Sequence, residues 1–546
     1  MSINIADTLA DSANNSGDQT GLIEAATGKS LTFSELHSRS DSYAHILINK
    51  GIRTGERVML MIKPSADFIC LTFALFKIGA PVILIDPGMG YKNLLRCIEG
   101  VRPQGFVGIP KAHLFRLLFR KPFTTVTHKL CCGNSFGFFG PDISQQATEE
   151  YGSYPVYAAK DDDLAAIIFT TGSTGPPKGV RYEHSMFHAQ LRLIRDYYNI
   201  GPGQVDQPAF PLFALFSTAL GAKAVIPDMD PTRPAKVDPA RFVASIEKYG
   251  VTYSFGSPAI WNVIAGFCKP RDARLKTLNK VLMAGAPVSG ELIGRMQNIL
   301  SPTAAIHTPY GATESLPIVS IEGHEIVEKT WSLTKQGKGT CVGRPLPGIE
   351  IAILPISDKV ISHLERKDFL LPGETGEIIV CGDVVTRAYE NNAEENKMAK
   401  IPDGNTFWHR MGDVGYLDED GRLWFCGRRA HRVVCEKINK IFYPIPCEAL
   451  FNVHPEVFRT ALVAVHSSGV IKDTVPAIII EPEKSSTLSA RQLIAEVKEI
   501  GQQNALTQEI DHYLIHPDFP VDIRHNAKIF REKLSVWASK ELEAKL

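Results

Sequence analysis

The chain has 546 residues, and its 59 Lys and Arg balance 59 Asp and Glu to a formal net charge of zero. This length exceeds what one hydrophobic core normally holds, so we expect two or more domains. The balanced charge, without a long basic block, argues against a nucleic-acid partner, and ten scattered cysteines without a C-x-x-C pair argue against a zinc site or disulfide framework.

The N-terminal region is polar and acidic and lacks the basic-then-apolar pattern of a signal peptide. The most apolar run, Phe68–Ile85, is interrupted by Lys77, Gly79 and Pro81. It therefore falls short of the about 20 uninterrupted apolar residues that a membrane span needs. We expect a cytoplasmic protein with reduced thiols.

The first 160 residues alternate helical and strand patterns. Thr32 and Glu35 have the spacing of a capping box at the start of the first long helix. The predicted elements are a helix at Leu31–Lys50, a strand at Arg57–Ile62, a helix at Ala66–Ile78, a strand at Pro81–Asp86, a helix at Val237–Gly250 and a strand at Thr252–Phe255. This alternation of helices and strands predicts a mostly parallel sheet covered by helices.

The segment Lys111–Lys129 interleaves Leu and Phe with Lys and Arg. Two interpretations are open. A basic amphipathic helix can lie on an anionic membrane. The commoner alternative is a surface helix that packs one face on its own domain.

The stretch Asp163–Val180 carries the strongest chemical signal. An apolar strand, Leu164–Phe169, leads into a loop with three glycines, four hydroxyl side chains and one lysine, Lys178. Inward-turned backbone N–H groups, hydroxyls and a lysine predict a cradle for a polyphosphate. The spacing differs from a Walker A loop, because Pro176 and Pro177 stand where that loop would enter its helix.

This loop resembles the signature of the adenylate-forming superfamily, which activates carboxylates as acyl-AMP with ATP and releases pyrophosphate. The resemblance implies Mg²⁺ as the second cofactor. It also implies that Thr170 has a catalytic role and that the rest of the loop holds phosphate. These phosphate-binding residues are Thr171, Gly172, Ser173, Thr174, Gly175 and Lys178.

Two further stretches match the family in the expected order. An apolar strand closes on Gly285, Ala286 and Pro287, which the resemblance places in one wall of the adenine pocket. About 130 residues beyond the phosphate loop, a Tyr-Gly-x-Thr-Glu motif follows the next strand. Its implied roles are adenine stacking by Tyr310 beside Gly311, phosphate binding by Thr313, and catalysis with Mg²⁺ coordination by Glu314.

The segment Ala209–Ala222 matches the acyl-pocket helix of the family. Ala214 stands where many members have histidine. The resemblance implies an acyl cavity lined by Phe213, Phe216 and Leu220, although such residues are equally typical of an ordinary core.

A hairpin is predicted over Trp408–Phe425, closed by Asp420-Gly421. Within it Asp413 follows a glycine, and the family uses this aspartate to accept both ribose hydroxyls; the structural alternative is an Asx turn. Arg428 is implied to help bind the nucleotide at the start of the hinge.

The resemblance implies an α/β fold with two domains. Residues 1–427 form a large N-terminal domain of mixed and parallel sheets with packed helices and a β-rich subdomain. Residues 428–546 form a small α+β lid that moves about a hinge near 428–431. Lid strands are predicted at Phe458–Val465 and Ala477–Glu481 and a helix at Ser489–Asn504. Lys528 matches the catalytic lysine of the closing motif and would neutralise charge between carboxylate and α-phosphate.

The stretch Glu436–Tyr443 lacks the glycines that line a coenzyme A tunnel in the family, and His431 replaces the hinge aspartate. With these features the chain looks most like the olefin-biosynthesis β-lactone synthetases within the superfamily. The resemblance implies that a long-chain 3-hydroxy fatty acid is activated and that its own hydroxyl displaces AMP. The alternatives are an acyl-CoA synthetase or acyl-AMP ligase, and a non-catalytic relative. The partner is then a carboxylate, with association to a membrane or to a pathway enzyme left open.

Overall fold

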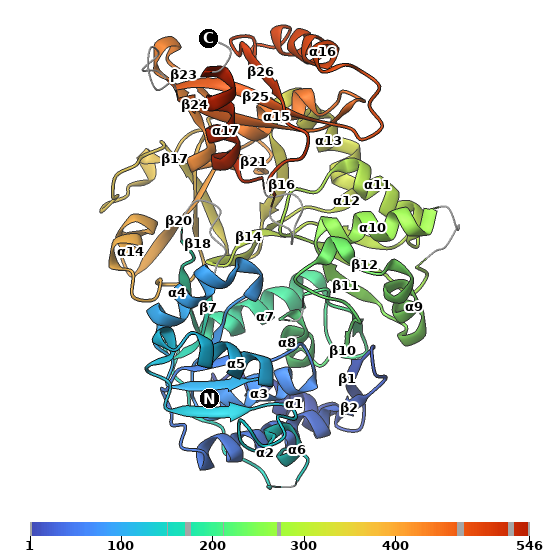
Figure 1. The fold of residues 1–546 in the computed structure, drawn as a ribbon, viewed down its shortest axis with the longest axis vertical. Coiled ribbons are helices and arrows are strands. Elements are labelled where there is room, and N and C mark those ends of the chain that lie inside the picture. The colour runs from blue at the N-terminus through green and yellow to red at the C-terminus, as the bar shows by residue number, and fades with distance from the viewer. Residues whose placement is uncertain are drawn as a thin grey trace.

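A computed structural model describes residues 3–149, 151–169, 176–210, 212–269, 275–466, 474–521 and 529–543. In Figure 1 the chain forms a broad lower part from its elements up to β13 (Ala305–His307), a β-rich middle and a smaller upper part from its C-terminal elements. No helix in these ranges combines the length and apolarity needed to cross a membrane.

Two mostly parallel sheets form the lower part, as predicted. The first has the order β6-β5-β3-β4-β7-β8 and is parallel except at β7–β8. Its strands are β3 (Val58–Met61), β4 (Val82–Leu84), β5 (Gly105–Gly108), β6 (His128–Cys131), β7 (Leu164–Phe169) and β8 (Gly179–Glu183). The phosphate loop therefore lies between two antiparallel strands.

The second sheet has the order β13-β12-β11-β9-β10-β1-β2 and is parallel except at β1–β2. Its strands are β1 (Thr20–Glu24), β2 (Ser30–Thr32), β9 (Val205–Asp206), β10 (Lys223–Ile226), β11 (Tyr253–Gly256), β12 (Lys280–Met283) and β13 (Ala305–His307). The carboxyl ends of parallel strands carry loops to one edge, which places the predicted site segments together.

Helices cover both sheets. The capping box is confirmed, because Thr32 accepts from the Glu35 N–H and Glu35 accepts from the Thr32 N–H. The helices are α1 (Asp7–Ser16), α2 (Phe33–Asn49), α3 (Ala66–Lys77), α4 (Tyr91–Val101), α5 (Pro110–Leu118), α7 (His184–Tyr198), α8 (Phe213–Ala219), α9 (Pro239–Tyr249), α10 (Pro258–Cys268) and α11 (Gly290–Ile299).

The middle part is an antiparallel sheet with the order β14-β15-β16-β21-β20-β18-β17, to which β19 adds beside β20. The predicted hairpin is its β20–β21 pair, with Gly421 at φ +70° in the turn. Its elements are β14 (Tyr310–Ala312), β15 (Ser315–Ser320), β16 (Thr340–Pro345), β17 (Glu350–Leu354), β18 (Gly376–Cys381), α14 (Ala393–Ala399), β19 (Lys400–Asp403), β20 (Thr406–Leu417) and β21 (Leu423–Arg428).

The C-terminal part has its own three-stranded sheet and two apolar clusters drawn only from residues beyond Arg428. The predicted lid strands and helix are present as β24, β25 and α16. The elements are β22 (Val433–Cys435), β23 (Lys440–Phe442), α15 (Pro444–Phe451), β24 (Val457–His466), β25 (Thr474–Pro482), α16 (Ala490–Gln502), β26 (His512–Ile515) and α17 (Arg531–Glu543). This is the small α+β unit that the sequence predicted.

Candidate active site

One cavity of about 920 Å³ lies where the three parts of the chain meet. Most of the predicted site residues line it: Lys178, Gly285, Ala286, Pro287, Tyr310, Gly311, Thr313, Glu314, Asp413 and Arg428. Two predicted groups, Thr170–Gly175 and Lys528, lie outside the described residues. Their described neighbours Pro176 and Ile529 both line the cavity.

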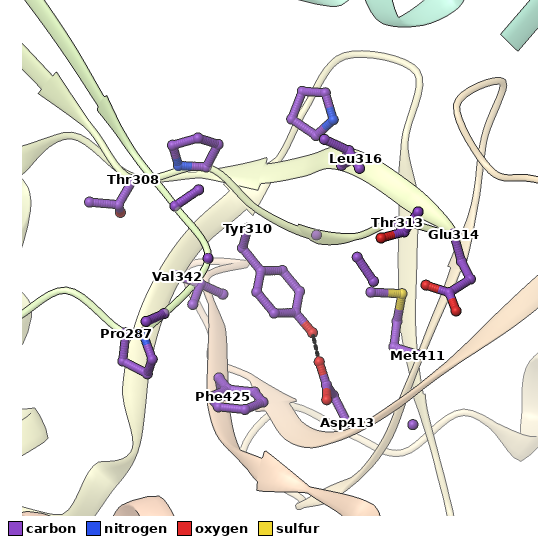
Figure 2. Close-up of a pocket in the computed structure, with 18 of the residues that line it drawn as sticks. Pro287, Thr308, Tyr310, Thr313, Glu314, Leu316, Val342, Met411, Asp413 and Phe425 are labelled. Carbon is purple, nitrogen blue, oxygen red and sulfur yellow. Dashed lines mark hydrogen bonds between the residues drawn. The ribbon is translucent and has the colours of Figure 1, made fainter. Parts of the chain in front are cut away.

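Asp413 is the centre of a polar group on the nucleotide side. Its carboxylate is almost fully buried, accepts a 2.5 Å hydrogen bond from the Tyr310 hydroxyl and lies 2.8 Å from the Arg428 guanidinium. Figure 2 shows the Tyr310 hydroxyl directed at this carboxylate. The negative charge of Asp413 raises the pKa of Arg428, whereas burial raises the pKa of Asp413 against the opposing charge of Arg428. The Asp413 side chain thus connects segments that are distant in the sequence.

The backbone at two glycines is shaped for this site. A Cβ at Gly311 would lie 2.5 Å from the Ser315 carbonyl oxygen, so a larger residue would push the Tyr-Gly-x-Thr-Glu segment apart. Gly285 has φ +94°, a conformation that L side chains rarely adopt. At both positions glycine permits a backbone conformation or a close approach that a larger residue would disturb.

Glu314 and Thr313 follow on the same segment. Glu314 Oε1 accepts a 2.9 Å hydrogen bond from the Tyr389 hydroxyl, and the Thr313 carbonyl accepts one of 2.6 Å from the Tyr182 hydroxyl. The described ranges hold no cluster of three or more His, Cys, Asp or Glu suited to a metal. A single carboxylate next to a phosphate site still fits Mg²⁺, which is usually held by one or two carboxylates and substrate phosphates.

Lys178, the last residue of the phosphate loop, is held by α14. Its Nζ donates a 2.6 Å hydrogen bond to Glu395 and lies 5.2 Å from the centre of the Tyr389 ring. The ammonium group of Lys178 is therefore already paired with a carboxylate of the protein. Sequence reasoning missed Glu395 and Tyr389, because neither lies in a recognisable motif.

Lys400 lies beside the same group. Its ammonium donates to the Thr386 carbonyl and lies 6.0 Å from the centre of the Tyr389 ring. Burial lowers the pKa of Lys400 to about 7, and the nearby Glu314 charge opposes this shift.

The other half of the cavity is mostly apolar. The predicted residues Phe213, Phe216 and Leu220 all line it, and Phe213 stacks on Phe255 with ring centroids 3.7 Å apart. Ala214, at the position of the family histidine, is fully buried and contributes to the core beneath. These residues form a surface suited to an acyl chain.

One buried acid interrupts this apolar wall. Asp206 is 1% exposed, and its Oδ2 accepts a hydrogen bond from the Ser217 hydroxyl. Its Oδ1 has no hydrogen-bond partner in the described part of the chain. Burial raises the pKa of Asp206 well above its usual value, and the hydrogen bond from Ser217 opposes this shift. Sequence reasoning did not find it, since a lone aspartate in a short strand carries no signal.

Comparison with known proteins agrees with this geometry. The family model described as AMP-binding enzyme matches residues 9–390. The chain belongs to the AMP-binding enzyme family. It is therefore an adenylate-forming ligase that uses ATP.

Two bacterial relatives within this family are similar over most of their length. The chain is 43% identical to a protein named olefin beta-lactone synthetase from Stenotrophomonas maltophilia, over 95% of this chain and 93% of that protein. It is 42% identical to a protein of the same name from Xanthomonas campestris, over 95% and 92%.

Solved structures of AMP-binding enzymes share the fold at lower identity. ATP-bound MatB from Rhodopseudomonas palustris has a TM-score of 0.79 at 20% identity, over 99% of this chain and 100% of that chain. The amide bond synthetase McbA from Marinactinospora thermotolerans has a TM-score of 0.80 at 21% identity, over 98% and 99%. These likenesses confirm the predicted architecture.

Proposed function

We propose that this enzyme activates a long-chain 3-hydroxy fatty acid as acyl-AMP and closes the adenylate to a β-lactone. The single observation that carries the proposal is the 43% identity, across 95% of the chain, to a protein named olefin beta-lactone synthetase. A cavity with a polar nucleotide half and an apolar half supports it.

The first step joins acid and nucleotide. A carboxylate oxygen bonds to the α-phosphorus of ATP, the bond between the α- and β-phosphates breaks, and pyrophosphate leaves with the electron pair. We assign pyrophosphate binding to the loop ending at Lys178, charge neutralisation to Lys528, ribose binding to Asp413 and Mg²⁺ binding to Glu314. Bound Mg²⁺ would supply charge neutralisation at the phosphates. The protein residues act by positioning and electrostatics.

The second step is intramolecular. The 3-hydroxyl oxygen bonds to the acyl carbon, the bond from that carbon to the phosphate oxygen breaks, AMP leaves with the electron pair, and the hydroxyl proton passes to solvent. A hydroxyl held next to the acyl carbon has a high effective concentration, so no second substrate is needed. This suits a chain whose 436–443 stretch lacks the glycines of a coenzyme A tunnel.

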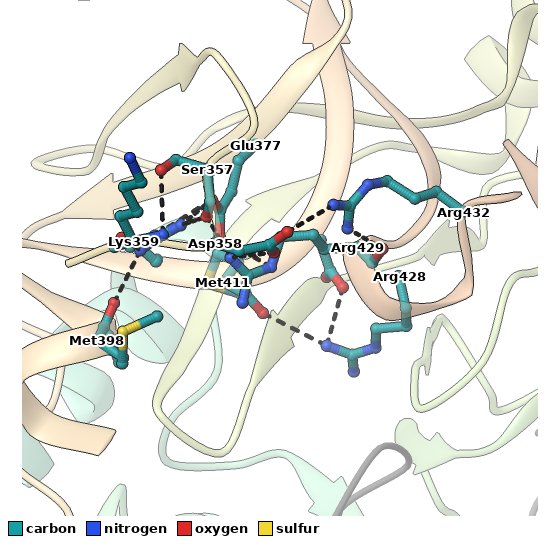
Figure 3. A network of polar contacts seen from close by, with 12 residues as sticks. Ser357, Asp358, Lys359, Glu377, Met398, Met411, Arg428, Arg429 and Arg432 are labelled. Carbon is teal, nitrogen blue, oxygen red and sulfur yellow. Dashed lines mark hydrogen bonds and ion pairs between the residues drawn. The ribbon is translucent and has the colours of Figure 1, made fainter. Parts of the chain in front are cut away.

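We also propose that residues 428–546 act as a lid that turns near 428–431. Figure 3 shows arginines that tie this stretch to the large part of the chain. Arg429 donates a 2.5 Å hydrogen bond to the Ser357 carbonyl, and Arg432 lies 3.0 Å from Asp358. Turning the lid would break these contacts.

The test is product analysis by mass spectrometry. Incubation with a 3-hydroxy fatty acid, ATP and Mg²⁺, without coenzyme A, should give a β-lactone and AMP in equal amounts. Added coenzyme A should not divert the product. Steady formation of a thioester would instead identify an acyl-CoA synthetase or a ligase that transfers the acyl group to a thiol.

We propose a reducing compartment such as the cytoplasm, because all ten cysteines are free and nine are buried.

Peripheral membrane contact is a further proposal. The α5 segment buries Ala112 and His113 but leaves Leu118 71% exposed beside Lys121. Vesicles containing anionic lipid should retain the enzyme, and Leu118→Ser should weaken retention. Leu371→Ser, at a 70% exposed leucine of the β-rich part, is the control.

A further inference from the structure

Helix α7 presents one face to the cavity. Gln190, Ile194 and Tyr198 all line the cavity and are spaced four residues apart, so they lie one above another on that face. Gln190 is 1% exposed, and its side chain contacts the carbonyl of Leu316, two residues beyond Glu314. It has no assigned role.

The orientation of the Gln190 amide is fixed. Its Nε2 donates a 2.9 Å hydrogen bond to the Leu316 carbonyl oxygen. Since a carbonyl oxygen only accepts, the amide nitrogen must face Leu316 and the amide oxygen must face elsewhere. That oxygen, Oε1, is buried and has no partner among the residues that the structure describes. Buried acceptors are normally paired, so this one is suited to a donor on a ligand.

The position of Gln190 specifies which part of a ligand it would meet. Leu316 lies two residues beyond Glu314 and also lines the cavity. The neighbouring Tyr182 hydroxyl donates to the Thr313 carbonyl at 2.6 Å. Gln190 therefore lies next to the segment that we assign to phosphate and Mg²⁺, at the reacting end of the acyl chain.

We propose that Gln190 Oε1 accepts a hydrogen bond from the 3-hydroxyl of the fatty acid and directs that oxygen toward the acyl carbon. The inference rests on the proposed function. An amide does not take a proton, so Gln190 binds and orients the hydroxyl while the proton passes to solvent. It would also make the enzyme prefer hydroxylated acids before any ring closes.

Gln207 has the same pattern of hydrogen bonds as Gln190 but lies away from the cavity. It is fully buried, donates from Nε2 to the Phe242 carbonyl at 3.1 Å, and also has an Oε1 without a partner in the described ranges. However, Gln207 does not line the cavity. It provides a matched control, because Gln→Met makes the same chemical change at both sites.

The test compares a 3-hydroxy fatty acid with the same acid lacking the hydroxyl, by the rate of pyrophosphate release in a single turnover, a step that precedes ring closure. At subsaturating acid, wild type and Gln207→Met should release pyrophosphate about tenfold faster with the hydroxylated acid, and Gln190→Met should lose this preference. A preference retained in Gln190→Met would overturn the inference.

A second measurement needs no variant. A 3-methoxy acid carries the same oxygen but cannot donate, so wild type should use it no better than the deoxy acid. Equal use of the methoxy and hydroxy acids would also overturn the inference. The proposed function is judged separately, by whether wild type releases a lactone.

Discussion

The two halves of the cavity differ in whether their polar groups are already paired within the protein. On the nucleotide side the charged groups are already paired within the protein: Asp413 contacts Arg428, and Lys178 contacts Glu395. On the acyl side, Asp206 and Gln190 each keep one buried oxygen without a hydrogen-bond partner in the described part of the chain. Asp413 Oδ1 also lacks a hydrogen bond there, but it is paired with the Arg428 guanidinium at 2.8 Å.

This difference indicates how each half meets its ligand. Under the roles that we propose, ATP would replace contacts that Asp413 and Lys178 already make within the protein. A polar group on the acyl chain would instead complete a hydrogen bond that the protein lacks. The predictions below test this distinction, beginning with the nucleotide side.

Replacing Lys528 should have the largest effect. Lys528→Ala should lower the rate of acyl-AMP formation by about two to three orders of magnitude, because a charge that acts in the transition state is lost. ATP binding by the large domain should change little. Pyrophosphate release in single-turnover reactions is the measurement, with Lys533→Ala, at an exposed lysine nearby, as control. A wild-type rate would exclude the assigned role.

Removing the charge of Asp413 should weaken ATP binding about ten- to hundredfold, because hydrogen bonds to a charged group contribute about 1.5–3 kcal/mol. Calorimetric titration of Asp413→Asn measures this. Asp420→Asn, at the exposed tip of the same hairpin, is the control. Unchanged ATP affinity with a lower Tm would mean that Asp413 only holds Tyr310 and Arg428 together.

Releasing Lys178 should give a smaller effect of opposite sign. Glu395→Gln removes the carboxylate that competes with phosphate, so ATP affinity should rise about two- to fivefold; the pair is partly exposed, and such pairs contribute under about 1 kcal/mol. Glu394→Gln, at the neighbouring exposed position, should change nothing. Weaker ATP binding by Glu395→Gln would show that Glu395 assists the nucleotide.

The smallest effect concerns stability at the acyl end. The pKa of Asp206 is raised in the folded state, whereas an unfolded aspartate ionises near pH 3.9. As pH rises above about 4, the unfolded state loses this proton first, so Asp206 costs stability progressively up to its folded pKa. Asp206→Asn should therefore raise the Tm at pH 8 relative to wild type, and the difference should shrink toward pH 4. Parallel Tm profiles would mean that Asp206 is ionised when folded.

The sequence predicted several residues that the structure places around one cavity, because they lie in short contiguous strings. Gly285, Tyr310 and Asp413 each belong to such a string, and all three line the cavity. The capping box of α2 was predictable for the same reason, since its contacts span only three residues.

The partners of these residues could not be predicted. Glu395 is 217 residues from Lys178, and Tyr389 is 75 residues from Glu314. Only the folded chain brings such pairs together. Gln190 and Asp206 look like ordinary helix and strand residues, and their significance comes from burial beside a cavity.

The spacing of the residues on the cavity-facing side of α7 has a further consequence. An α-helix advances about 5.4 Å per turn, so Gln190, Ile194 and Tyr198 sample the acyl cavity at three depths separated by about one turn each. The helix thus places one side chain per turn along the cavity wall. A larger side chain at Ile194 or Tyr198 would fill the cavity one or two turns away from Gln190, so the space for a substrate could change independently of the contact at Gln190.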